Sequence, residues 1–435
     1  RGLGDVYKRQ VFASCSKDPE LEPDTPPSTF KVRIDNVIHE TYFDSYPQGP
    51  SLFVPYLVMS GLPEGEKLLA FGGYYSPENP NPDGSDYTFI HDCADDELIQ
   101  GWDWTQELIY SAGWIDLPIP GKTYYFKGVV RTNKAVYYSN TVTINTDGLP
   151  GYTPGPQDRV LPVVFHVMPR KDGTYPHPYF FDEMLACANR LYRNVWPLPG
   201  LADAGIRFVP ATHAPDGTAL STPGIHYLDE RYELDLDISN EELRQWVGDN
   251  LWEMTEVINV WVSPFINDHI VSEDTSTAGF TFLPYFAPEE MLQGCNTAVP
   301  GCFSGIFLNQ EIVGNGYCNS GIAVFAHEAG HYLGLDHVFE EDWCDDTPQY
   351  DRARYRTEQY IPGIDTYLRY PIDASAEPYT ALNVMDYDIV IYSGITPQQA
   401  ERVRYTLQHA CLVPGGKPLP GNMKSCAGPA PKVMY

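Results

Sequence analysis

The stretch HEAGHYLGLDH combines three imidazoles and one carboxylate at spacings that suit a metal ion with a reactive water. His327 and His331 are four positions apart, so on a helix they lie on one face and can hold one metal ion as a pair. Glu328 follows the first histidine, where a carboxylate reaches a water on that metal. Gly334 lets the helix end, so that the chain turns back and brings in His337 as a third ligand. Three protein nitrogens leave the fourth position of a tetrahedral zinc to water, as in catalytic zinc sites.

Chance is the alternative explanation for this motif. HExxH alone occurs by chance in long proteins, and a histidine pair on a helix is more often a surface or core feature than a ligand set. Gly334 and His337 extend the match to five fixed positions. Random sequence of this length reaches such a match roughly once in ten thousand cases or fewer. We therefore expect a zinc site with Glu328 as the general base and acid.

A second motif, NVMDY, follows the histidines, and its Met385 comes 48 residues after His337. A methionine here would form the hydrophobic floor under the imidazoles, and Tyr387 could reach the metal or the substrate oxyanion. Taken alone, a Met before Asp-Tyr is ordinary core or turn sequence. After the elongated histidine motif, it resembles the Met-turn of the metzincin metalloproteases.

Residues on both sides of this turn narrow the resemblance to the pappalysin family of metzincins. That family shows a Cys and an Asp-Thr-Pro after the third His, then N-x-M-D-Y, then a helix that starts with Thr-x-x-Gln. The matching residues here are Cys344, Asp346, Thr347, Pro348, Asn383 to Tyr387, Thr396 and Gln399. Upstream, Leu161 to Pro169 and Ile258 to Phe265 resemble the family's first and central strands. The resemblance covers about residues 159–412.

The resemblance implies a zinc-dependent metalloendopeptidase that acts on protein or peptide substrates. It implies Glu328 and Tyr387 as catalytic residues, His327, His331 and His337 as zinc ligands, and Met385 as the structural residue of the Met-turn. Asp388 to Ser393 would wall the pocket for the side chain that follows the scissile bond, with a basic preference if Asp388 points into it. Calcium is a secondary expectation, and the short loop at Cys344-Asp345-Asp346 argues against a loop-borne calcium site.

Functions from other classes stay open at this stage. The chain could be a catalytically latent peptide-binding protein, although a decayed site tends to lose the residue equivalent to Glu328 first. It could instead be an adhesin lipoprotein that binds a host or matrix partner, and deletion of residues 29–146 would then remove binding but not peptidase activity. A zinc amidase acting on a non-peptide bond is chemically open, but the Met-turn favours peptides.

The remaining sequence predicts a multidomain protein, with an all-β sandwich before an α/β metzincin catalytic domain of the zincin type. In residues 29–146, KTYYFKGVVRT and AVYYSNTVTI read as a hairpin, and Tyr124 resembles the tyrosine corner of fibronectin type III sandwiches. Residues 147–158 form a Gly- and Pro-rich linker and residues 413–435 a Pro- and Gly-rich tail.

The pattern of the catalytic region, residues 159–412, alternates between strands and helices. Strands are expected at 160–168, 205–210 and 257–262, and helices at 181–195, 240–253 and 320–333, the last of which carries the histidine motif. The stretch Thr281 to Tyr285 is expected to be the edge strand against which an extended peptide pairs, as in metzincins generally.

Composition limits the number of domains and the classes of partner. A chain of 435 residues with 43% hydrophobic and 20% charged residues predicts two folded domains with ample core. The net charge of −30, from 58 acidic and 28 basic residues, repels nucleic acid and anionic membrane surfaces. No apolar run has the length of a membrane span, so no transmembrane helix is expected.

The start of the chain indicates export. The first ten residues, RGLGDVYKRQ, do not resemble a natural start, and Cys15 after Phe-Ala-Ser resembles the end of a truncated bacterial lipoprotein signal. Residues 1–28 are thus read as an artefactual start, signal remnant and tether. A lipid anchor at Cys15 would place the protein at the bacterial cell surface or outer membrane; otherwise we expect secretion.

The other eight cysteines, in an exported protein, favour disulfides. We expect Cys295 with Cys302, and Cys318 with Cys344, to staple the active-site cleft. Cys93 is expected to be a buried or cross-domain-paired cysteine rather than a thiolate that caps the zinc.

Overall fold

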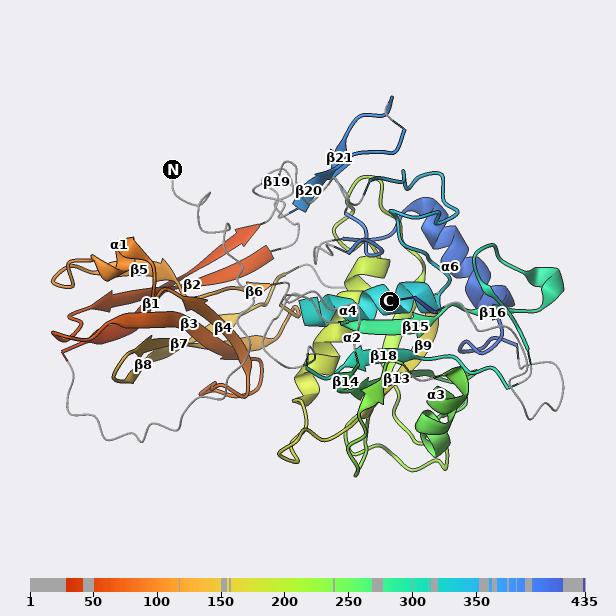
Figure 1. Cartoon of the computed structure of the whole chain (residues 1–435), viewed down its shortest axis with the longest axis horizontal. Helices are drawn as coiled ribbons and strands as arrows, with labels where there is room; N and C mark the ends of the chain where they lie inside the picture. The colour runs from red at the N-terminus through yellow and green to blue at the C-terminus, as the bar shows by residue number, and fades with distance from the viewer. Residues whose placement is uncertain are drawn as a thin grey trace. The chain divides into compact units, whose positions relative to one another are not determined.

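The computed structural model of the chain describes residues 29–41, 51–116, 118–149, 155, 158–237, 239–267, 277–299, 301–311, 313, 320–351, 360–361, 366–373, 375–380, 382–387, 393–417 and 433–434. These residues fall into two compact units, which divide after Leu149 (Figure 1). Within the described residues, no helix is long and apolar enough to cross a membrane.

The first unit consists of two antiparallel sheets. One sheet contains β1 (Lys31–Thr41), β2 (Ser51–Ser60), β5 (Leu108–Ser111) and β6 (Ile115–Asp116). The other has the order β4 (Tyr87–Asp92), β3 (Leu68–Ser76), β7 (Thr123–Thr132), β8 (Val136–Asn145), and α1 (Glu97–Gln100) follows β4.

The local sequence explains how these sheets pack. The β7–β8 hairpin forms as the pattern predicts, and Tyr124 and Phe126 of β7 are fully buried at alternate positions. The Tyr124 hydroxyl accepts a hydrogen bond from Ile119 N at 2.9 Å, the contact expected of a tyrosine corner. A Cβ atom at Gly128 would lie only 2.3 Å from Leu57 Cδ1, so the sheets approach each other closely at this point. The first unit is therefore a two-layer β structure.

The second unit is built on a seven-stranded sheet. Its order is β10 (Ile206–Pro210), β9 (Arg159–Val167), β13 (Ile258–Ser263), β18 (Ile306–Asn309), β15 (Gly279–Phe282), β22 (Val433–Met434), and β11 (Ile225–Tyr227) also pairs with β9. The pairs among β10, β9, β13 and β18 are parallel, whereas β15 runs antiparallel to β18. Every residue of β13, β15 and β18 is buried, as expected for strands that are covered on both faces.

In the described part of this unit, four helices accompany the sheet: α2 (Pro178–Tyr192), α3 (Asn240–Val247), α4 (Ser320–Tyr332) and α6 (Pro397–His409). Helix α2 packs beside α4, where the Tyr192 hydroxyl donates a hydrogen bond to Ala326 O at 2.9 Å. Phe325 of α4 packs against Phe165 and Phe208 of the sheet, with ring centroids 5.6 and 5.5 Å apart. The helix that carries the histidine motif is therefore anchored to both the sheet and α2.

Short elements complete the second unit. They are β12 (Leu234–Asp235), η2 (Gly248–Asn250), β14 (Phe265–Ile266), β16 (Tyr285–Phe286), η3 (Pro288–Glu290), β17 (Asn296–Thr297), β19 (Tyr360–Ile361), β20 (Thr366–Arg369) and β21 (Tyr379–Thr380).

The largest differences from the predicted boundaries lie in two helices and one strand. Helix α2 begins at Pro178, three residues before the predicted 181, because proline is favoured in the first turn of a helix. Helix α3 ends at Val247 because Gly248 has a φ of +48° and breaks the helical path. The predicted edge strand, β15, ends at Phe282 rather than Tyr285, since Pro284 has no N–H for a sheet ladder, and it is not the outermost strand, because β22 pairs with it.

Candidate metal centre

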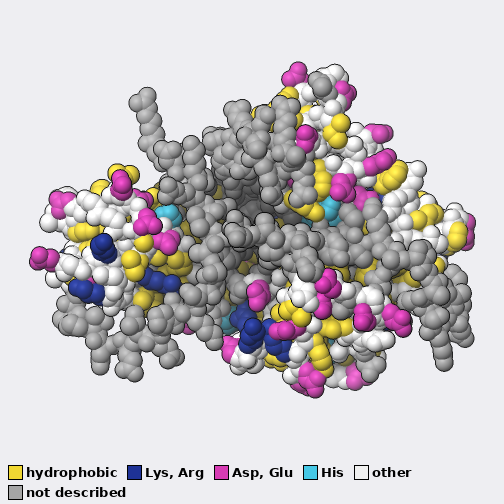
Figure 2. All heavy atoms as spheres, in the orientation of Figure 1, with side chains coloured by type: hydrophobic (Ala, Val, Ile, Leu, Met, Phe, Trp, Pro, Cys, Tyr) yellow, Lys and Arg dark blue, Asp and Glu magenta, His cyan; other side chains and the backbone are white. Residues whose placement is uncertain are grey.

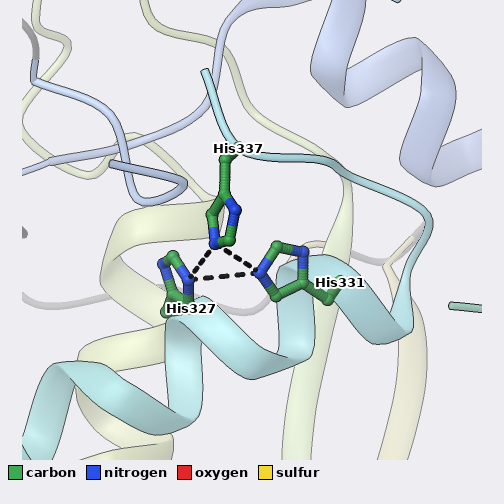
Figure 3. A group of neighbouring side chains, drawn as sticks. All are labelled: His327, His331 and His337. Carbon is green, nitrogen blue, oxygen red and sulfur yellow. Dashed lines mark hydrogen bonds between the residues drawn. The ribbon is translucent and has the colours of Figure 1, made fainter. Parts of the chain in front are cut away.

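The three histidines of the motif converge on one point (Figure 3). His327 and His331 project from α4, and His337 approaches from the segment that follows the helix. The three Nε2 atoms lie 3.1, 3.2 and 3.3 Å from one another. All three side chains are buried. The structure thus brings together the three histidines that the sequence predicts as metal ligands.

Backbone carbonyls orient two of these imidazoles. His327 Nδ1 lies 2.7 Å from Val384 O, and His331 Nδ1 lies 2.7 Å from Leu335 O. Nδ1–H is therefore the donor on each ring, which leaves the Nε2 lone pair directed at the centre of the cluster. Burial lowers the pKa of His327 to about 4, so the neutral ligand form prevails at neutral pH.

The spacing of the nitrogens fits a tetrahedral metal. Zn–N bonds of about 2.0–2.1 Å place ligand nitrogens roughly 3.3–3.4 Å apart. The observed separations of 3.1–3.3 Å are close to that value. Among the described residues, these histidines are the one group of three or more His, Cys, Asp or Glu side chains placed to share an ion. The expected calcium site has no support from the described residues.

Glu328 lies buried beside the ligands. Its Oε2 has no hydrogen-bond partner in the described part of the chain, and burial raises the pKa of the carboxyl well above its usual range. The first residue of β15 is packed against it, because a Cβ atom at Gly279 would lie 3.0 Å from Glu328 Cγ. An unsatisfied carboxylate oxygen in a dry site can accept a proton from a water bound to the metal.

Met385 and Tyr387 lie on different sides of the histidines. Met385 is fully buried, and a Cβ atom at Gly330 would lie 2.2 Å from its Sδ, so the thioether packs directly under α4. The Tyr387 ring packs edge-on against His337 with centroids 4.6 Å apart, and 37% of its surface is exposed. Met385 therefore supports the helix, while Tyr387 is open to solvent beside a ligand.

Residues of the predicted motifs bind one another. Asn383 Nδ2 donates to Gln399 Oε1 at 2.8 Å, and Asn383 Oδ1 accepts from Met385 N at 2.9 Å. Thr396 and Gln399 form the capping box of α6, and the Thr396 hydroxyl donates to Asp346 Oδ1 at 2.7 Å. These contacts connect the Met-turn, the start of α6 and the loop after the third histidine.

Sequence reasoning missed two residues that hold this turn. Asp386 accepts a hydrogen bond from the Tyr350 hydroxyl at 2.8 Å and forms an ion pair with Arg369 Nε at 3.0 Å. Nothing in the spacing of Tyr350 and Arg369 indicates a role at the Met-turn. Asp336, expected to be structural, is buried and would clash at 2.8 Å with a Cβ atom at Gly294.

Most of the predicted substrate pocket lies outside the described residues. Of residues 388–393, only Ser393 is among the described residues, and it is buried. Among the other histidines, His166 and His226 contact each other with Nδ1 atoms 2.9 Å apart, away from the cluster.

The predicted disulfide between Cys295 and Cys302 was wrong, and the predicted pair of Cys318 with Cys344 includes a residue outside the described part of the chain. Cys295, Cys302 and Cys344 carry thiols. Cys302 Sγ accepts from Val299 N at 3.3 Å, whereas Cys295 Sγ lies 3.7 Å from Arg402 Nη2, so the two sulfurs have different neighbours. Cys318 lies outside the described residues. Cys93 is a buried thiol whose pKa burial raises to about 12, which opposes the thiolate form.

Comparison with known proteins decides the family of the second unit. Residues 241–408 match the family model Peptidase_M43, described as pregnancy-associated plasma protein-A. This region belongs to the pappalysin family. The matched region is therefore a metalloendopeptidase domain, and its family implies peptide substrates. No curated protein matches the chain.

Solved structures with similarity to the chain include three of mirolysin. Mirolysin in complex with compound 9 is 18% identical, with a TM-score of 0.41, and the match covers 58% of this chain and 92% of that one. Mature mirolysin of Tannerella forsythia with a cleaved peptide is 18% identical, with a TM-score of 0.39 and coverage of 58% and 93%. A mutant of Tannerella forsythia promirolysin is also 18% identical, with a TM-score of 0.39 and coverage of 60% and 83%.

Proposed function

We propose that the pappalysin-family domain is a zinc-dependent endopeptidase with Glu328 as its general base and acid. The observation that carries this proposal is the convergence of three buried Nε2 atoms within 3.1–3.3 Å, next to a buried carboxylate. His327, His331 and His337 would hold the ion through neutral imidazoles. When bound, zinc polarises a water and lowers its pKa towards about 7.

Two side chains, Glu328 and Tyr387, would act on the attacking water and on the substrate carbonyl. Glu328 Oε2, which lacks a partner among the described residues, accepts the proton of the attacking water and delivers it to the leaving amine. The Tyr387 phenol, open to solvent beside His337, donates a hydrogen bond to the carbonyl oxygen of the substrate as negative charge develops there. Met385 keeps α4 and its two ligands in place from below.

The location of the enzyme is a separate part of the proposal. The sequence around Cys15 supports export with a lipid anchor, and Cys15 lies outside the described residues. The first unit, read as a sandwich over residues 29–146, would act as a spacer or adhesion module between the anchor and the protease domain of residues 159–412. Acidic side chains are spread over the described surface (Figure 2), which suits basic rather than acidic substrates.

The decisive experiment compares three forms of the full chain on a mixed peptide library, with and without a zinc chelator. The forms are the natural sequence, Glu328→Gln, and Glu341→Gln as a control that removes an exposed carboxylate near the motif. We expect chelator-sensitive cleavage by the natural form and the control, and loss of cleavage in Glu328→Gln at unchanged zinc content. Bound zinc without cleavage by the natural form would instead indicate a latent or peptide-binding protein.

A further inference from the structure

The outer edge of β15 is paired with the C-terminal segment of the chain. Strand β22 runs antiparallel to β15, with Thr281 opposite Met434 and Phe282 opposite Val433. The other edge of β15 pairs with β18, so both edges of the strand carry partners. A segment more than 150 positions away in sequence thus completes the sheet at this edge.

This edge borders the catalytic carboxylate. Strand β15 lies alongside α4 (Figure 1), and its first residue, Gly279, packs against Glu328 at a hypothetical Cβ distance of 3.0 Å. The register gives the direction of β22: Val433 lies opposite Phe282, and the next residue, Met434, lies opposite Thr281. The C-terminal strand therefore runs along β15 towards the end that touches Glu328.

We propose that the C-terminal segment is a built-in competitor for the peptide-binding edge of the protease domain. The inference rests on the proposed endopeptidase function and deepens it. A peptide that binds by strand addition uses the backbone N–H and C=O groups of the free sheet edge. Strand β22 pairs with Thr281 and Phe282 along this edge, so the tail and an extended substrate exclude each other there.

Tethering makes even a short strand an effective competitor. Lys417 is the last described residue before β22, and 16 positions separate it from Val433. The chain between these residues tethers β22 to the domain, and a short tether gives an effective concentration on the order of millimolar. If the intrinsic dissociation constant of this two-residue ladder is also on the order of millimolar, β22 occupies the edge about half of the time or more. Removal of the competitor should lower KM about two- to tenfold and leave kcat unchanged.

The test compares two full-length variants, matched in length, with one shortened form. Val433→Pro with Met434→Pro removes both N–H groups of β22, whereas the control, Val433→Ala with Met434→Ala, keeps the backbone able to pair. A third form ends after Lys417. Each form is assayed for kcat and KM on one peptide substrate, and hydrogen exchange is followed over residues 279–283. A synthetic peptide of residues 418–435 is added to the truncated form.

The expected result is a lower KM and faster exchange over residues 279–283 in the proline and truncated forms, with the alanine form close to the natural chain. The added peptide should raise the KM of the truncated form and restore slow exchange. Equal KM and equal exchange in all forms would overturn the inference, as would faster exchange with unchanged KM in an active enzyme. If every form lacks peptidase activity, the proposed function fails, and exchange alone then decides whether the tail docks on β15.

Discussion

Arg369 and Asp386 form an ion pair inside the pappalysin-family domain, with Nε 3.0 Å from Oδ2 and both side chains fully buried. Asp386 lies between Met385, which packs under α4, and Tyr387, which packs against His337. The pair therefore connects the Met-turn to strand β20. It also holds in place Met385 and Tyr387, the sequence neighbours of Asp386.

Removal of one member of this ion pair should lower the free energy of unfolding. Arg369→Met leaves the Asp386 carboxylate buried without its counter-ion, and we expect a loss of about 3–5 kcal/mol in the free energy of unfolding. The double variant Arg369→Met with Asp386→Leu should recover much of that loss, because no charge is left in the core. Urea denaturation of the full chain measures both.

The control for this pair is an exposed one. Lys417 contacts Glu290 with a half-exposed side chain, so Lys417→Met should lower the free energy of unfolding far less than Arg369→Met. Equal losses in Arg369→Met and Lys417→Met would show that the buried pair does not stabilise the Met-turn.

Tyr387 should act on the rate rather than on substrate binding. In the proposed mechanism its hydroxyl donates a hydrogen bond only as the substrate oxygen gains charge, so Tyr387→Phe should lower kcat about 100-fold with a small change in KM. Tyr405→Phe is the control, since that hydroxyl donates to Glu290 O on the outside of α6. A change in KM alone would assign Tyr387 to substrate binding.

Zinc should stabilise the fold through the three histidines. Unfolding separates the Nε2 atoms that lie 3.1–3.3 Å apart, so free zinc at 100 times its Kd should add about 2.7 kcal/mol to the free energy of unfolding. His331→Ala should abolish this gain in thermal denaturation, whereas His213→Ala, an exposed histidine outside the cluster, should keep it. A gain that persists in His331→Ala would place the stabilising ion elsewhere.

Acid should destabilise the domain through His166. Its Nε2 lies 3.0 Å from Asn259 Oδ1 and its Nδ1 2.9 Å from His226 Nδ1, so an added proton would oppose the N–H of His226. Burial lowers the pKa of His166 from 6.5 to about 3 in the folded state. The unfolded chain therefore binds more protons between these values. Stability is full above pH 6.5 and falls by about 1.4 kcal/mol for each unit below it, towards pH 3.

This pH dependence can be assigned with a variant that does not titrate. His166→Asn should be less stable at pH 7 but should lose less stability between pH 6 and pH 4 than the natural chain. His213→Asn provides the comparison for an exposed histidine. Identical slopes in the natural chain and His166→Asn would show that other groups cause the acid sensitivity.

Local patterns determined the parts of the site that the sequence could reveal. A spacing of four places His327 and His331 on one helix face whatever surrounds the helix, and the Thr396–Gln399 capping box needs only one turn of chain. The β7–β8 hairpin likewise follows from two adjacent β-rich runs. Such features depend on neighbours in sequence, so residue type and spacing are enough to predict them.

The tertiary structure alone decided which distant groups meet. The ion pair of Arg369 with Asp386, the thiol state of Cys295 and Cys302, and the pairing of β22 with β15 have no local signature. Cysteine spacing favoured a small disulfide loop, but the path of the chain gives the two sulfurs different neighbours. Strand addition uses backbone groups that every residue except proline carries, so no side-chain pattern marks the segment that covers the edge of β15.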